Sequence, residues 1–238
     1  MAVLEVWEQH GSPYLAATAV MDRDHPAVRE FAQDIVHGMD DPVEKAVKLY
    51  LAVRDRIRYD PYSPFHLPLH YQASFILSRK RGFCIPKASL LCTLARACHI
   101  PCRLGFATVK NHLATRQLVE YLGSDLFVYH AFVEFYLEGR WVKATPAFNR
   151  ELCERHGVAP LEFNGREDSL FQPYNAAHEK FMEYVEELGS YADVPLENIL
   201  SAWEVAYGRE RLRTWVQAHE NSPEGQGRDF EKETVIDD

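Results

Sequence analysis

Apolar residues recur at intervals of three and four in three stretches of the first hundred residues, which is the spacing of one helix face. The first stretch predicts a helix that starts at Asp24 and runs to about His37. The second starts at Asp41, where an Asp-Pro-x-Glu sequence resembles a capping box, and is broken near Pro61. We expect both helices to be scaffold, because their apolar faces serve packing.

The third stretch predicts a helix over residues 84–99. Pro86 suits its first turn, where a missing N–H costs nothing, so Cys84 falls at the start of the helix. Gly82 precedes it and allows either a close approach of the backbone or a positive φ. The apolar face of this helix carries Ala88, Leu91, Cys92, Ala95 and Cys98.

Aromatic and β-branched residues dominate residues 126–137, and a Glu138-Gly139 turn separates them from residues 140–147. This pattern predicts a β-hairpin, with a further strand at residues 102–109 beside it. If Glu138 and Gly139 are the turn residues, the facing pairs include Tyr136 with Trp141, Glu134 with Lys143, and Phe132 with Thr145.

Strict alternation would divide the first hairpin strand into two faces. The face of His130 is the more polar one, and it comprises Val128, His130, Phe132, Glu134 and Tyr136. The opposite face is wholly apolar and is expected to be core; it comprises Phe127, Tyr129, Ala131, Val133, Phe135 and Leu137. Thr145 would lie on the His130 face, diagonal to His130 at about 7–8 Å.

Helical patterns return after a long connection at residues 161–169. One helix is predicted from Asn175 to Gly189, and another from about Pro195 to Ala218. The end of the chain is rich in Gly, Glu and Asp, so we expect it to be mobile or held only by surface contacts. We therefore expect one domain over residues 1–220, with its core at about 41–149, and an acidic tail over 221–238.

Composition supports a single globular domain, because 238 residues with 47% hydrophobic content can bury a sizeable core. The formal net charge of −9 argues against a nucleic-acid partner. No stretch is long and apolar enough to span a membrane, and residues 1–10 lack the apolar region of a signal peptide. The five cysteines are odd in number and show no Cys-x-x-Cys spacing. We expect reduced thiols, a cytoplasmic protein, and no metal or cofactor.

Cys84 and His130 are the candidate chemical groups. Unpaired N–H groups and the positive dipole end of a helix N-terminus stabilise a thiolate, and Lys87 would add a nearby cation. His130 lies 46 residues later, in a predicted strand, and is a candidate base. The alternative is that Cys84 is only a small buried hydrophobe, as most free cysteines are.

Several segments in order resemble the transglutaminase-like (papain-like) superfamily. They are Arg81-Gly82-Phe83-Cys84, Leu91 to Arg96, Ile100-Pro101-Cys102-Arg103, His130-Ala131-Phe132-Val133-Glu134 and Arg140-Trp141-Val142. The resemblance implies an α+β fold in which the nucleophile helix packs on an antiparallel sheet, with extra N- and C-terminal helices. It also implies that Cys84 is the nucleophile and His130 the base.

The sequence departs from the family pattern after the tryptophan. The family's Asp-Pro, whose Asp orients the histidine, is replaced by Thr145-Pro146. A neutral group in this role has precedent among cysteine enzymes that use Asn. Either Thr145 orients the imidazole weakly, or Asn149 or Asp168 from the following segment takes the position.

These features together predict acyl transfer on an amide bond through a Cys84 thioester, with hydrolysis of a peptide, protein or other amide as the favoured outcome. A true cross-linking transglutaminase and a small-molecule acyltransferase would use the same residues. Because Thr145 replaces a carboxylate, a catalytically silent binding or scaffold protein is the competing class. The sequence fixes neither the substrate nor the oligomeric state.

Overall fold

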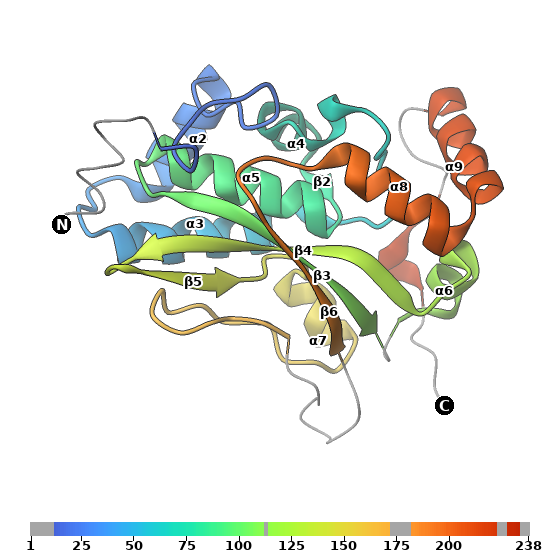
Figure 1. The fold of residues 1–238 in the computed structure, drawn as a ribbon. Coiled ribbons are helices and arrows are strands. Elements are labelled where there is room, and N and C mark those ends of the chain that lie inside the picture. Colours follow the sequence, from blue (N-terminus) through green and yellow to red (C-terminus); the bar gives the residue numbers. More distant parts are fainter. Residues whose placement is uncertain (1–11, 112–113, 172–181, 223–227, 234–238) are drawn as a thin grey trace.

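A computed structural model describes residues 12–111, 114–171, 182–222 and 228–233. Figure 1 shows helices packed against a twisted antiparallel sheet, which confirms the predicted α+β class. The helices are α2 (Pro26–Val36), α3 (Pro42–Arg56), α4 (Ala73–Arg79), α5 (Cys84–Ala97), α6 (Arg116–Leu122), α7 (Arg150–Arg155), α8 (Leu196–Tyr207) and α9 (Arg209–Asn221), with 3-10 turns at Pro68–Tyr71 and Phe230–Lys232. The strands are β1 (Arg58–Tyr59), β2 (Arg81–Gly82), β3 (Cys102–Asn111), β4 (Leu126–Leu137), β5 (Arg140–Ala144) and β6 (Met182–Tyr191).

The main sheet has the strand order β5-β4-β3-β6, and every neighbouring pair is antiparallel. The predicted hairpin register is confirmed for Tyr136 with Trp141 and for Glu134 with Lys143. The predicted pairing of Phe132 with Thr145 is wrong, because β5 ends at Ala144 and the Thr145 N–H bonds Ser169 instead. The side chains of Glu134 and Lys143 nevertheless form their ion pairs with other strands. Glu134 pairs instead with Arg103 of β3, and Lys143 with Glu187 of β6.

Strict alternation fails at the start of β4. Ala107 of β3 faces His130, but Val109 faces Phe127, so one β3 residue opposes two β4 residues. Tyr129 within this β-bulge has a φ of 60°, which is rare outside glycine. The predicted two-face division therefore holds only from His130 onward. The face predicted to be polar is also covered, because His130, Phe132 and Glu134 are all buried.

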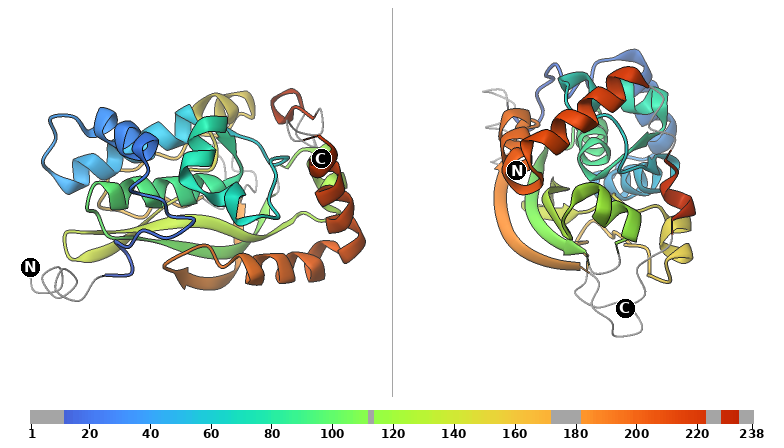
Figure 2. Two further views of the ribbon diagram at one scale, coloured as in Figure 1. Left: turned by 90° about the horizontal axis from the view of Figure 1, so that it is seen from above. Right: turned by 90° about the vertical axis from the view of Figure 1, so that its right-hand side faces the viewer.

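Helix α5 is the central helix of the fold. All its residues from Cys84 to Arg96 are buried, and α2, α3 and α4 lie with it on one side of the sheet (Figure 2). A helix buried on every side is typical of the middle of a core. Asp41 caps α3 as predicted, by accepting from the backbone N–H groups of Val43 and Glu44 at 3.3 and 3.2 Å. The first predicted helix is also present, but its N-cap is His25, not Asp24.

The C-terminal third differs most from the prediction. Where a helix was expected up to Gly189, the chain forms β6, an edge strand of the sheet. Asn175, the expected start of that helix, lies outside the described residues. The next predicted helix is two helices, α8 and α9, because Gly208 with a φ of 92° separates them. Part of the expected tail is buried: Phe230 is 5% exposed and contacts the ring of Tyr59.

Within the described residues, no helix has both the length and the apolar character needed to cross a membrane.

Candidate active site

A short parallel strand pair fixes the chain where it enters α5. Tyr59 of β1 faces Gly82 of β2, and Cys84 follows two residues later as the first residue of the helix. A Cβ on Gly82 would come within 2.8 Å of the Pro86 side chain, so the predicted close approach is confirmed. The N-cap residue Phe83 offers no side-chain cap. The first N–H groups of α5 therefore lack the usual capping acceptor.

Three backbone N–H groups surround the Cys84 sulfur and favour its anion: those of Ala131, Ile85 and Cys84 itself. Burial opposes them and has the larger effect, because it raises the pKa of Cys84 to about 11. The thiol is 8% exposed. The expected stabilisation of a free thiolate is therefore wrong for this structure, and the resting group is a neutral thiol.

His130 is also neutral in the folded protein. Its side chain lies in the bulged part of β4, where burial lowers its pKa to about 4. Its Nε2 atom is buried and has no hydrogen-bond partner within the described part of the chain. The ring of Phe171 lies 5.6 Å from the imidazole, centroid to centroid.

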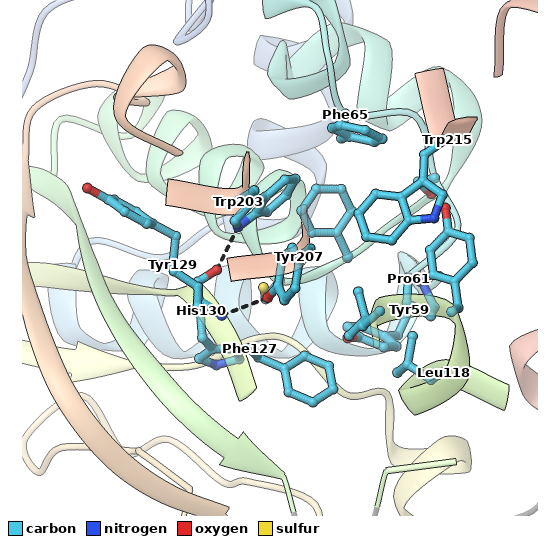
Figure 3. Close-up of a pocket in the computed structure, with 16 residues that line it drawn as sticks. Tyr59, Pro61, Phe65, Leu118, Phe127, Tyr129, His130, Trp203, Tyr207 and Trp215 are labelled. Carbon is cyan, nitrogen blue, oxygen red and sulfur yellow. Dashed lines mark hydrogen bonds between the residues drawn. The ribbon is translucent and has the colours of Figure 1, made fainter. Parts of the chain in front are cut away.

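Cys84 and His130 line one pocket, shown in close-up in Figure 3. The pocket has a cavity volume of about 70 Å³, which is room for a few waters or a small group. Among its described lining residues there is no Asp, Glu, Lys or Arg. Its walls are mostly aromatic and include Phe65, Phe83, Tyr121, Trp203, Tyr207 and Trp215.

The family model of the transglutaminase-like superfamily matches residues 29–146, which contain both candidate groups. The chain belongs to this superfamily. The matched residues include α5, β3, β4 and β5.

Two solved structures are similar to this superfamily member. A putative cysteine protease from Cytophaga hutchinsonii is 16% identical, with a TM-score of 0.49, over 79% of this chain and 48% of that chain. A putative protease from Parabacteroides distasonis ATCC 8503 is 14% identical, with a TM-score of 0.35, over 60% of this chain and 25% of that chain. This chain thus spans about half and about a quarter of their lengths. No curated protein matches it.

Thr145, the third candidate catalytic residue, is 1% exposed. Its N–H donates to the Ser169 carbonyl at 3.0 Å, and its own carbonyl accepts from the Tyr50 hydroxyl at 3.2 Å. Its Oγ1 atom is buried and lacks a hydrogen-bond partner in the described chain. The backbone of Thr145 is therefore fixed, while its hydroxyl makes no hydrogen bond of regular geometry within the described residues.

The two alternative orienting residues are held elsewhere. The Asn149 amide group donates to the Arg54 and Ile57 carbonyls, and its oxygen accepts from the Tyr59 N–H. Asp168 accepts from the backbone N–H of Lys143 at 2.8 Å. Within the described residues neither side chain hydrogen-bonds His130, so both have structural roles.

Lys87 does not supply the cation expected beside Cys84. Its Nζ donates to the carbonyls of Arg54 and Ile57, at 2.9 and 2.5 Å, at the end of α3. The side chain is fully buried, and burial holds its pKa well below the ordinary lysine value. This prediction was wrong because helix periodicity does not reveal in which direction a buried lysine points.

Sequence reasoning missed three residues at the site. Trp203 and Tyr207, one turn apart on α8, line the pocket and hydrogen-bond the β4 backbone. Tyr184 of β6 has a buried hydroxyl, and side-chain and backbone contacts from Thr145 and Phe171 act on its pKa. Its segment was predicted to be helical, which concealed its place on the sheet.

Proposed function

We propose that this protein is a cysteine hydrolase that cleaves an amide bond through a Cys84 thioester, with His130 as the general base. One observation carries the proposal. The N–H of Ala131, the residue after His130, acts on the Cys84 sulfur, and both candidate groups line the same pocket. The proposed nucleophile and base thus line one small pocket, as acyl transfer between them requires.

The first half-reaction uses the neutral thiol. The sulfur attacks the carbonyl carbon while its proton passes to His130, so an S–C bond forms and the carbonyl oxygen becomes an oxyanion. We assign the N–H groups at the start of α5, which lack a side-chain cap, as the donors to that oxyanion. Collapse of the intermediate breaks the C–N bond, and the imidazolium of His130 gives its proton to the leaving amine.

The second half-reaction regenerates the enzyme. Water attacks the thioester carbonyl as His130 takes its proton, the C–S bond breaks, and the thiol is restored by proton return from the imidazolium. The carboxylic acid is the second product. In this proposal the Thr145 hydroxyl orients the imidazole of His130.

In this proposal the Cys84 thiol passes its proton to His130 during the attack, and the two residues do not form a thiolate–imidazolium ion pair at rest. The pKa values of about 11 and about 4 differ by about 7. This difference disfavours the charged pair by about 10 kcal/mol at about 1.4 kcal/mol per pKa unit, whereas two charges even as close as about 4 Å, at a dielectric constant near 20, would attract by only about 4 kcal/mol. The neutral pair is therefore the resting state.

A burst experiment separates hydrolase, cross-linking enzyme and silent scaffold. Wild type and Cys84→Ser are mixed with p-nitrophenyl butyrate, with and without a primary alkylamine as a second acceptor. We expect a burst of p-nitrophenolate from wild type alone, followed by turnover to butyric acid even when the amine is present. Predominant butyramide formation would identify a transglutaminase, and equal rates in both proteins would identify a scaffold.

A further inference from the structure

Two side chains of α8 occupy the backbone hydrogen-bonding groups along the edge of β4 beside Cys84. The Nε1–H of Trp203 donates to the Val128 carbonyl at 2.8 Å, and the Tyr207 hydroxyl accepts from the Val128 N–H at 2.9 Å and donates to the Leu126 carbonyl at 3.1 Å. Dashed lines in Figure 3 mark the hydrogen bonds that Trp203 and Tyr207 make to the backbone of β4. Peptide substrates that bind as an added strand need such backbone groups free. At this edge α8 already occupies them.

The pocket next to this edge suits a short apolar group. Its described walls are uncharged and mostly aromatic, so a charged substituent would lose its water without gaining a partner. The space of about 70 Å³ is roughly half that of the about 150 Å³ apolar cavity that holds benzene. A branched chain of about four or five carbons matches it better than an aromatic side chain does.

We propose that the site takes the amide of a short, uncharged aliphatic acid, with the acyl chain in the aromatic pocket, and does not take an extended polypeptide. This inference rests on the proposed function for the reaction and on the pocket for the specificity. Each methylene added to the acyl chain should strengthen binding about fourfold until the pocket is full.

Binding to Cys84→Ser tests the specificity without requiring any turnover. The fluorescence of the tryptophans, two of which line the pocket, is titrated with 3-methylbutanamide, acetamide, succinamate and an unfolded polypeptide. We expect saturable binding of 3-methylbutanamide, binding of acetamide weaker by at least tenfold, and no saturation with the other two. Preferential binding of succinamate or the polypeptide, or no saturation with 3-methylbutanamide, would overturn the inference.

The two proposals fail in distinguishable ways. If 3-methylbutanamide binds Cys84→Ser but wild type forms no acyl-enzyme, the pocket inference stands and the hydrolase proposal fails. If wild type cleaves p-nitrophenyl butyrate and an unfolded polypeptide equally well, the hydrolase proposal stands and the specificity inference fails.

A matched pair on α8 tests the pocket wall. Trp203→Phe keeps a ring but loses the hydrogen bond to Val128, whereas Val205→Ala changes a side chain on the same helix that is 89% exposed. The acyl chain length that binds most tightly should become longer in Trp203→Phe and should stay the same in Val205→Ala. An unchanged optimum in a folded Trp203→Phe protein would contradict the assignment.

A second inference concerns three buried polar atoms on β4, on β6 and just after β5. They are Nε2 of His130, Oγ1 of Thr145 and Oη of Tyr184, and in the described chain none makes a hydrogen bond of regular geometry. An unpaired buried polar atom costs stability, so a native structure that keeps three of them together calls for a role.

The sheet brings Tyr184 to this place. Tyr184 faces Val109 of β3, and Val109 faces Phe127 at the β4 bulge that carries His130. The Thr145 side chain and the Phe171 N–H both contact the Tyr184 hydroxyl closely enough to favour its anion, although burial raises its pKa to about 12. The Phe171 ring in turn contacts the imidazole.

We infer that Tyr184 is a positioning residue, which together with Thr145 supplies hydroxyl acceptors for the Nε2–H of His130 in place of the superfamily's carboxylate. The test is the pKa of His130 measured by NMR in Tyr184→Phe, with Tyr191→Phe on the same strand as the control. We expect only Tyr184→Phe to lower it. In Thr145→Asp the pKa should rise, and adding Tyr184→Phe should then change nothing. Equal effects of the two tyrosine variants would overturn the inference.

Discussion

The backbone N–H of Ala131 acts on the sulfur of Cys84, although Ala131 lies within β4 and Cys84 opens α5. This contact exists because β5 ends at Ala144, so it pairs with β4 only as far as Val133. Beyond that point Thr145 turns away to bond Ser169. Along the part of β4 that β5 leaves unpaired, the start of α5 reaches the strand that carries His130.

Replacement of Cys84 should remove chemistry and little else. Cys84→Ala should abolish acyl transfer, while the melting temperature changes by only a few degrees, because a buried sulfur contributes about 1 kcal/mol of packing. Burst kinetics and thermal denaturation measure the two effects. A collapsed melting temperature together with intact turnover would show that Cys84 is only a packing residue.

The thiol should titrate at high pH. Since burial raises the pKa of Cys84 to about 11, the ultraviolet thiolate band in the difference between wild type and Cys84→Ser should be absent at neutral pH and grow in above about pH 10. The difference spectrum cancels the other four cysteines. A band already present near pH 6 would instead reveal a thiolate–imidazolium ion pair.

Acid should weaken the fold through His130. Its folded pKa of about 4 lies below the ordinary 6.5, so the unfolded chain binds more protons and stability is lost as the pH falls from about 6.5 towards 4. At pH 5 the loss from this residue is about 2 kcal/mol. Urea denaturation of wild type and His130→Gln at pH 7 and pH 5 should show a smaller loss for the variant. Equal losses would contradict the assigned burial.

Asn149 should matter for stability and not for the chemical step. Asn149→Ala removes hydrogen bonds that tie the end of α3 to β1, which should cost about 1–3 kcal/mol of unfolding free energy. Its turnover per folded molecule should stay within a few-fold of wild type. Denaturation and active-site titration separate these effects, and a large fall in kcat without lost stability would return Asn149 to the catalytic set.

The parts of the fold that sequence could predict are those governed by local rules. The cap at Asp41, the start of α5 at Cys84 and the Tyr136–Trp141 register all follow from spacing and turn chemistry. The bulge at Tyr129 could not be predicted, because no local signal marks a positive φ at a tyrosine. Periodicity also misassigned β6, where residues at helical spacing lie in an edge strand.

At the site, the residue types were predictable but their electrostatics were not. Helix position suggested an acidic thiol, whereas burial raises the pKa of Cys84. Lys87 was expected to assist the thiolate, and it instead binds the end of α3. Both errors arise because desolvation and side-chain direction depend on segments that are distant in sequence. The position of Tyr184 on the sheet depends on such segments too.

The most direct test of the central claim is to identify the acylated atom by mass spectrometry of the intact and digested protein after mixing with p-nitrophenyl butyrate. We predict one butyryl group, on Cys84, that turns over in wild type and decays much more slowly once formed in a folded His130→Ala protein. Acylation spread over other residues, or equal decay in the two proteins, would contradict a Cys84 nucleophile served by His130.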